Sequence, residues 1–333
     1  MKSNKLKNTL LRWWATWNPN MYHGWGRDNS YFEGWYFKIV DAAEQNVFAV
    51  IPGISKGLDG RHHAFIQVLD GKACRASYHD FETADFRPSE KDFHLQLGAN
   101  SFSSNHLQLS LPELKGRIDF QDSTPWPKML GAPGIMGWYS FMPFMECYHG
   151  VVSLHHRLKG EMTVYGKPSD FNGGIGYIEK DWGVSFPRSW IWMQSNHFQQ
   201  KEKVCLMASV AHIPWLGSYF IGYIVGFQWG EKLYRFATYT GAQMKAAITE
   251  KTVTLAFKDR RYRLEVTGEQ APGAKLVSPI TGNMTGKVNE SMQGVLHVRF
   301  FEKEKLVFEG TGRNAGLEIA GQVQELLTET WRR

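Results

Sequence analysis

Short runs of apolar residues that alternate with polar ones, and that are broken by glycine, proline, asparagine and aspartate, dominate the chain after residue 20. A period of two is typical of β-strands, and pairs such as Asp59-Gly60 and Asp70-Gly71 are typical of hairpin turns. No stretch alternates strands with long helices. The pattern therefore predicts an all-β chain with about fifteen strands or more.

So many strands fit two antiparallel barrels or sandwiches better than a single sheet. We place the boundary in the turn-rich sequence YGKPSDFNGG, which gives an N-terminal β lobe of residues 21–165 and a C-terminal β lobe of residues 166–333. Residues 121–145 are rich in proline, glycine, tryptophan and methionine, and they predict a long irregular segment of the kind that often carries function. The sequence QVQELLTETWRR predicts a short helix at the C-terminus.

Residues 1–20 form a separate segment with the period of an amphipathic helix. Its apolar residues fall on one helical face, namely Leu6, Leu10, Trp13, Trp14 and Trp17. Basic side chains supply positive charge, and Asn18-Pro19 predicts the end of the helix. Such a helix either docks on the protein body or makes peripheral contact with an anionic membrane through residues 2–17. No apolar stretch is long enough for a transmembrane helix and no signal peptide is evident, so we expect a cytoplasmic protein.

Composition narrows the function classes without choosing one. The net charge of +6 is diffuse, and no basic cluster or nucleic-acid motif accompanies it, so no nucleic-acid partner is predicted. The three cysteines are far apart, and no zinc, phosphate-loop or dinucleotide motif is present, so neither a metal nor a cofactor is expected. The aromatic content of 14% includes 13 tryptophans and fits a β-rich core, a sugar-stacking surface or a pocket for a hydrophobic ligand.

The stretch YFEGWYFKIV, residues 31–40, places a carboxylate inside an apolar run. On a strand, Glu33 shares one face with Trp35, Phe37 and Ile39. Apolar neighbours raise the pKa of a carboxyl group, and a carboxylic acid that keeps its proton at pH 7 can act as a general acid. The alternative is a structural carboxylate that is paired with a cation or caps backbone amides.

A second stretch, residues 173–198, carries two carboxylates on one strand face. If residues 177–182 are extended, Tyr177, Glu179 and Asp181 share a face, and Lys180 and Trp182 point the other way. Carboxylates about 7 Å apart suit acid/base chemistry, since one can hold the proton that the other lacks. The alternative is a network of salt bridges with nearby basic side chains, namely Lys180 and Arg188.

Two further patterns flank these carboxylates. In WIWMQSN, one face is an aromatic wall that ends in neutral amides, as a pocket for an amphipathic ligand requires; it comprises Trp190, Trp192, Gln194 and Asn196. Ordinary core packing is the alternative. In FMECYHG, Glu146 and Tyr148 share one face and Cys147 and His149 share the other.

Two of these stretches together resemble the tocopherol cyclase family. YFEGWYF, residues 31–37, and YIEKDWGVSFPRSWIWMQSN, residues 177–196, are similar to tryptophan-rich motifs of the plant enzymes and occur in the same order. GWYSFMPFMECYHG and MYHGWGRD are similar more loosely. Asp181 stands where the plant motif has Asn, and Val184-Ser185 where it has glycines. These departures leave the substrate open between a prenylated quinol and another isoprenoid lipid.

The resemblance implies two lipocalin-like β lobes and closure of a prenylated hydroquinone to a chromanol without a cofactor. Such a reaction needs an acid, a dry pocket and aromatic faces. The residue patterns give Glu33, Glu179, Asp181, Glu146 and His149 as candidate catalytic residues. They give Trp35, Tyr177, Trp182, Trp190, Trp192, Gln194 and Asn196 as candidate substrate-binding residues. The other hypotheses are an acid-catalysed hydratase, a lipocalin-like carrier of a hydrophobic ligand, and a carbohydrate-binding β protein.

Overall fold

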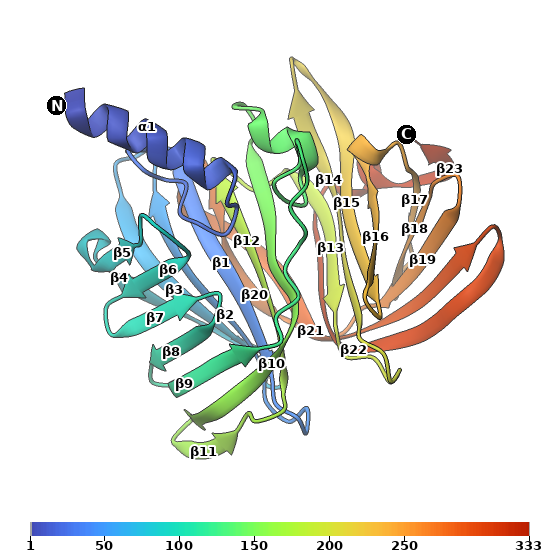
Figure 1. Cartoon of the computed structure of the whole chain (residues 1–333), viewed down its shortest axis with the longest axis horizontal. Coiled ribbons are helices and arrows are strands. Elements are labelled where there is room, and N and C mark those ends of the chain that lie inside the picture. Colours follow the sequence, from blue (N-terminus) through green and yellow to red (C-terminus); the bar gives the residue numbers. More distant parts are fainter. Residues whose placement is uncertain (1, 333) are drawn as a thin grey trace. The chain divides into compact units, whose positions relative to one another are not determined.

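The computed structural model describes residues 2–332, and its strands form two antiparallel sheets, as the hydrophobic pattern predicts (Figure 1). The chain divides into two compact units. Unit 1 comprises the chain up to Asp70 together with Ala76–Phe186 and Val277–Lys287; unit 2 comprises Gly71–Arg75, Pro187–Leu276 and the chain from Val288 on. Each unit is a lipocalin-like lobe with its own apolar core.

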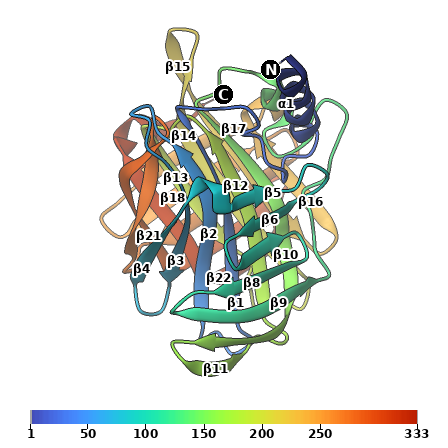
Figure 2. The same cartoon turned by 90° about the vertical axis from the view of Figure 1, so that its left-hand side faces the viewer.

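Unit 1 contains a 12-stranded sheet in the order β4-β3-β2-β1-β12-β10-β9-β8-β7-β6-β5, with β11 beside β10. Side chains from its two ends, such as Ile66 on β3 and Leu95 on β6, belong to one apolar cluster, so the sheet curls around that core (Figure 2). The strands are β1 Tyr31–Val40, β2 Val47–Lys56, β3 His62–Asp70, β4 Arg75–Phe81, β5 Phe86–Pro88, β6 His94–Leu97, β7 Asn100–Ser103, β8 His106–Ser110, β9 Leu114–Gln121, β10 Cys147–Val164, β11 Lys167–Asp170 and β12 Ile175–Gly183.

Most of an 11-stranded sheet belongs to unit 2, in the order β16-β15-β14-β13-β22-β21-β19-β18-β17-β23 with β20 beside β21; residues 277–287, where β20 ends and β21 begins, belong to unit 1. Its core is filled by rings such as Phe227, Phe257 and Phe300. The strands are β13 Ser189–Ser195, β14 Val204–Trp215, β15 Ser218–Trp229, β16 Lys232–Ala237, β17 Gln243–Ile248, β18 Thr252–Lys258, β19 Tyr262–Glu269, β20 Ala274–Ile280, β21 Asn283–Glu302, β22 Lys305–Gly321 and β23 Thr328–Arg332.

In the described part of the chain, helical structure is confined to short elements and one N-terminal helix, α1, Lys2–Thr16, which was expected. The 3₁₀ helices are η1 Thr83–Asp85, η2 Gly137–Phe141, η3 Thr238–Thr240 and η4 Val323–Leu326. The expected C-terminal helix extends only over η4, because the following residues form β23, which pairs with β17. The threonines and the tryptophan in TETWR favour a strand. Within residues 2–332, no helix is long and apolar enough to cross a membrane.

The predicted lobe boundary at residues 165–166 falls inside unit 1. The turn-rich sequence there forms the hairpin between β10 and β11, and the units divide at Phe186 and Pro187 instead. β12 belongs to unit 1 because it pairs with both β1 and β10. Unit 1 also includes residues 277–287, where the Gln67 side chain bonds the backbone of Val277. Such a return of the chain leaves no signal in local sequence.

Candidate active site

The strand β12 carries two clusters of polar side chains, one on each face. Its register with its neighbours sets Tyr36 of β1 opposite Glu179, and His149 of β10 opposite Asp181. Lys180 and Trp182 point toward the core of unit 1, where Trp182 joins the apolar cluster. The alternate residues of β12 point to the other face, as the period-two pattern predicts.

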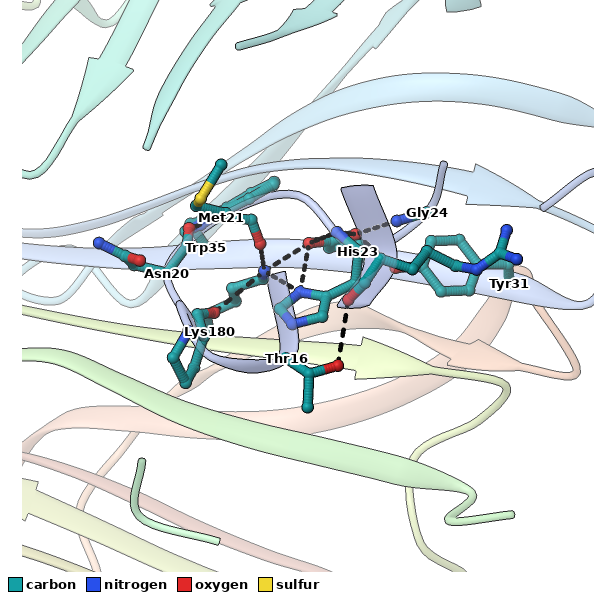
Figure 3. Close-up of polar contacts among 11 residues, drawn as sticks. Thr16, Asn20, Met21, His23, Gly24, Tyr31, Trp35 and Lys180 are labelled. Atoms are coloured by element: carbon teal, nitrogen blue, oxygen red, sulfur yellow. Dashed lines mark hydrogen bonds and ion pairs between the residues drawn. The ribbon is translucent and has the colours of Figure 1, made fainter. Parts of the chain in front are cut away.

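The core-side cluster is built around an ion pair between Lys180 and Glu33. Figure 3 shows Lys180 among its neighbours His23, Met21 and Trp35. The Nζ atom of Lys180 lies 2.5 Å from Oε1 of Glu33, and both side chains are completely buried. The same Nζ atom lies 2.8 Å from Nδ1 of His23. It also donates to backbone carbonyls of the segment that follows α1, those of Pro19 and Met21. The indole rings of Trp35 and Trp182 lie 4.7 and 4.6 Å from it, in cation–π contact.

Glu33 is a carboxylate in this structure, and the predicted raised pKa is wrong. Burial alone would raise its pKa, but the charge of Lys180 and the hydrogen bonds from His23 hold the pKa below its ordinary value. The backbone N–H groups of His23 and Gly24 donate to its oxygens at 3.0 and 3.2 Å, and the Tyr31 hydroxyl donates as well. An acceptor that is satisfied in this way holds no proton to give away. The geometry matches the structural alternative.

The two basic partners of Glu33, Lys180 and His23, both have lowered pKa values. Burial lowers the pKa of Lys180 to about 8 in spite of the opposing charge of Glu33. Burial and the charge of Lys180 also lower the pKa of His23 to about 4, so its ring is neutral at pH 7. The cluster thus contains one cation and one anion, and it fastens residues 19–24 to the core of unit 1.

The two tryptophans predicted to bind substrate on this face pack around the ion pair. Trp35 stacks on Phe93 at 5.4 Å and donates its indole N–H to the carbonyl of Asn20. Trp182 stacks on His23 at 4.1 Å and on Tyr148 at 5.5 Å. These contacts account for both rings without a ligand, and the substrate contact remains a prediction.

The opposite face of β12 brings together four of the predicted residues. The Nδ1 atom of His149 lies 2.8 Å from Oδ1 of Asp181, and its Nε2 atom lies 3.3 Å from Oε2 of Glu179. The Tyr177 hydroxyl donates to the same Glu179 oxygen at 2.5 Å. The side chain of Glu179 is 6% exposed and that of Asp181 is 26% exposed, so solvent reaches Asp181 more readily.

His149 is an imidazolium between the two carboxylates. Burial lowers its pKa, but the charges and hydrogen bonds of Asp181 and Glu179 outweigh burial and raise the pKa to about 10. We refer to His149, Glu179 and Asp181 as the acid/base trio.

The trio also offers three atoms that could ligate a metal ion. One atom from each side chain lies within 4.8 Å of the others. A histidine must be neutral to ligate, so a metal would first have to displace the proton that the two carboxylates stabilise. The expectation that the protein needs no metal remains a prediction.

Glu146 lies just before β10 and differs from the other carboxylates. Burial raises its pKa, and no ion pair to another described residue offsets this effect. Its backbone carbonyl accepts hydrogen bonds from the N–H groups of Val184 and Ser185. By alternation its side chain shares a face with Tyr148, whereas Cys147 and His149 both contact Asp181 on the other face.

In unit 2, the predicted aromatic wall lies on the face of β13 opposite the core residues Ile191 and Met193. The indole N–H of Trp190 donates to Glu318 at 2.6 Å. Trp192 lies over Gly316, where a Cβ atom would be only 2.5 Å from its ring. The amides at the end of this face, Gln194 and Asn196, are buried. Trp190, Trp192 and Gln194 therefore share a face of β13, Asn196 lies beyond the end of the strand, and their contact with substrate remains a prediction.

Sequence reasoning missed the roles of Lys180, His23 and Tyr31. Alternation placed Lys180 beside Trp182 and away from Glu179, but it gave no partner for the buried cation. The register of β1 with β12 sets Trp35 opposite Lys180, which makes Glu33 its diagonal neighbour. Arg188, the other cation proposed to neutralise the carboxylates of β12, pairs with Glu325 instead.

Comparisons with known proteins agree with this architecture. A family model described as tocopherol cyclase-like matches residues 117–321. The probable chloroplastic tocopherol cyclase of Oryza sativa subsp. japonica is 23% identical over 196 residues, which cover 56% of this chain and 42% of that protein. The chloroplastic tocopherol cyclase of Zea mays is 21% identical over 196 residues, with 56% and 41% covered. The match thus spans less than half the length of these relatives.

Two solved structures share the fold. CghA, crystallised with Sch210972, has a TM-score of 0.54 at 11% identity and covers 87% of this chain and 89% of its own. Kievitone hydratase from Nectria haematococca has a TM-score of 0.50 at 12% identity, with 87% and 89% covered. Since the family model matches more than half of the sequence, the chain belongs to the tocopherol cyclase-like family.

Proposed function

We propose that this protein is an isomerase-type cyclase that acts on a hydrophobic prenylated hydroquinone. It protonates the prenyl alkene, and the phenol oxygen of the same molecule closes a chromanol ring. The reaction changes no oxidation state overall, because the proton added to carbon is balanced by the proton that leaves the phenol oxygen. The protein must therefore supply an acid for the first step and a base for the last.

The observation that carries this proposal is the acid/base trio on β12. A single imidazolium lies within 2.8 Å of one carboxylate and 3.3 Å of another. Two carboxyl groups around one fixed cation can hold different numbers of protons at different stages of a reaction. The family membership favours the same chemistry, since its named plant relatives are tocopherol cyclases.

We assign proton donation to Asp181. Its side chain is the most exposed of the trio, so it can take up a proton from water between turnovers. His149 stays cationic beside it and compensates the negative charge that develops on Asp181 as the proton moves to the alkene. The tertiary carbocation forms at the more substituted alkene carbon, where the phenol oxygen attacks it.

Glu179 has a different role in this scheme. It accepts a hydrogen bond from the Tyr177 hydroxyl, and its Oε2 atom lies 3.3 Å from Nε2 of His149. A carboxylate held in this way keeps His149 protonated and fixes the orientation of its ring. The Asp181 carboxylate that remains after the first step then accepts the proton that leaves the phenol oxygen, which restores the starting state.

Glu146 is the rival proton donor, because burial raises its pKa in the absence of a paired cation. It lies on the other face of the chain from the trio. Loss of turnover in Glu146→Gln, with turnover kept in Asp181→Asn, would transfer the donor role to Glu146.

Hydration of the same alkene is the second candidate function. Water in place of the phenol oxygen would capture the carbocation and yield a tertiary alcohol. The 26% exposure of the Asp181 side chain favours this alternative, because it brings water to the proton donor. A neighbour in fold carries the name kievitone hydratase, in keeping with such an outcome.

The experiment that tests the proposal is incubation of the purified protein with a phytyl hydroquinone under reducing conditions. Chromanol is separated by chromatography and compared with a blank that lacks protein, because cyclisation leaves the mass unchanged. Chromanol above the blank supports the cyclase, and a product heavier by one water supports the hydratase. Binding of the quinol without any product would contradict both and indicate a carrier.

A further inference from the structure

The helix α1 turns its apolar face away from the rest of unit 1. The residues that share this face are largely exposed: Leu6 is 65% exposed, Leu10 59%, Trp13 62% and Trp14 48%. The opposite side of the helix is the one that packs, with Ala15 completely buried. An amphipathic helix that docks on its own protein does the reverse and buries its apolar stripe.

Polar contacts hold the helix in this orientation. Arg12 donates from Nη1 to the carbonyl of Trp25, and Lys7 forms an ion pair with Glu90 at 2.6 Å. Asn8 lies against Gly26, where a Cβ atom would come within 2.6 Å of its amide nitrogen. These contacts fix the orientation of α1, so its apolar face points outward in the folded unit.

The irregular segment 129–144 extends the same apolar surface. Large apolar side chains are exposed along it, namely Met129, Leu130, Trp138, Phe141 and Phe144, with Leu130 completely exposed. The rings of Trp17 and Phe141 lie 5.1 Å apart, and Nζ of Lys128 lies 2.6 Å from Oδ1 of Asn18. Both views show α1 and the segment with η2 at the same end of unit 1 (Figures 1 and 2).

The charge of this surface has one sign. Residues 2–27 and 123–145 contain several basic residues and no aspartate or glutamate; those with described side chains are Lys5, Lys7, Arg12, Arg27 and Lys128. Lys7 and Arg12 make the contacts that hold the helix, with Glu90 and the carbonyl of Trp25, so Lys5 and Lys128 supply the positive charge next to the exposed apolar side chains. A surface that combines exposed tryptophan and leucine with unopposed positive charge is complementary to the interface of an anionic bilayer, where indole rings lie at the depth of the headgroups.

We infer that α1 and the segment 129–144 form a surface that docks on an anionic lipid bilayer. We call it the docking face. Exposed apolar patches of this extent are uncommon on soluble monomers and mark interaction sites. The one-sided charge favours an anionic lipid surface over a second copy of the chain, because two copies would bring like charges together. This inference is independent of the proposed function, since none of the acid/base trio lies on the docking face.

Co-sedimentation with vesicles tests the inference on the full chain. One set of vesicles is pure phosphatidylcholine, and the other contains one quarter phosphatidylglycerol. We expect the wild-type protein to bind the anionic vesicles, to bind the neutral ones more weakly, and to lose affinity as salt is raised. The variant Leu10→Gln/Trp13→Gln should bind the anionic vesicles at least about tenfold more weakly.

The matched control is Leu58→Gln, which removes a side chain that is 62% exposed in the turn after β2. It should bind as the wild type does. Circular dichroism and thermal unfolding confirm that each variant is folded. Equal binding by the wild type and the double variant, or no binding to either vesicle, would overturn the inference. A concentration-dependent dimer that the double variant abolishes would also overturn it, because a second copy would then cover the face.

Discussion

The Nζ atom of Lys180 lies 2.5 Å from Oε1 of Glu33, and neither side chain is exposed to solvent. This contact joins the two motifs that carry the family resemblance, and it does so on the core side of β12. It explains why a carboxylate stands in the middle of an apolar strand. The acid/base trio lies on the other face of the same strand. Because side chains alternate along a strand, the structural ion pair and the proposed catalytic residues are kept apart.

The variant Glu33→Gln should be less stable than the wild type. It leaves Lys180 as a buried charge without its counter-ion, and breaking one partner of a buried pair typically costs about 3–5 kcal/mol. Chemical denaturation monitored by tryptophan fluorescence gives the free energy of unfolding. A Glu302→Gln variant, which removes a surface partner of Arg261, should unfold nearly as the wild type does.

A double-mutant cycle separates the pair from its surroundings. Glu33→Gln/Lys180→Met removes both charges, so its loss of stability should be smaller than the sum of the two single losses. Additive losses would show that the two side chains act independently. An unchanged free energy of unfolding in Glu33→Gln, with turnover abolished, would return Glu33 to a catalytic role.

The stability of the protein should depend on His149 at alkaline pH. Its pKa is about 10 in the folded state and about 6.5 in the unfolded chain, so the folded state binds the proton more tightly. The resulting stabilisation is complete below pH 6.5 and is lost as the pH rises through 10. Each unit of the difference in pKa corresponds to about 1.4 kcal/mol.

The measurement is the free energy of unfolding of the wild type and of His149→Asn from pH 6 to pH 10. The difference between the two proteins should shrink as the pH rises. Lys180 contributes a slope of the opposite sign in the upper part of this range, because its pKa is lowered to about 8. It is present in both proteins and cancels from the comparison. A difference that stays constant with pH would show that His149 is neutral.

The variant Gly316→Ala should displace Trp192. The added Cβ atom would lie 2.5 Å from the indole ring, so the ring must move. Overpacking of this kind costs about 1–3 kcal/mol. If Trp192 contacts substrate, the apparent KM should rise as well. In Gly316→Ala/Trp192→Phe the smaller ring should recover part of the stability. No recovery would show that the glycine is needed for another reason.

The alternation of side chains made much of the site predictable. It correctly placed Tyr177, Glu179 and Asp181 on one face, and His149 with Cys147 on another, because a strand leaves only two choices for each side chain. It could not show that His149 and Cys147 lie beside the three residues of β12. That contact depends on the pairing of β10 with β12, which joins positions about thirty residues apart.

The state of Glu33 was beyond local reasoning for a related reason. Its apolar neighbours along β1 suggested a raised pKa, but the charge that lowers it comes from Lys180, on a strand 147 positions further along the chain. The same holds for the unit boundary, because pairing with β1 and β10 places β12 in unit 1. The helical period of residues 2–17 predicted α1 but did not show which of its faces packs.

Turnover of a phytyl hydroquinone in D₂O tests the acid/base trio most directly. Protonation of the alkene from a solvent-fed donor places one deuterium on carbon, where it survives transfer to H₂O. The wild type and Glu146→Gln should give chromanol one mass unit heavier than the substrate. Folded Asp181→Asn and His149→Gln should lose about 10²–10⁴-fold in rate. Labelled chromanol formed at the wild-type rate by Asp181→Asn, with Glu146→Gln inactive, would contradict the role of the acid/base trio.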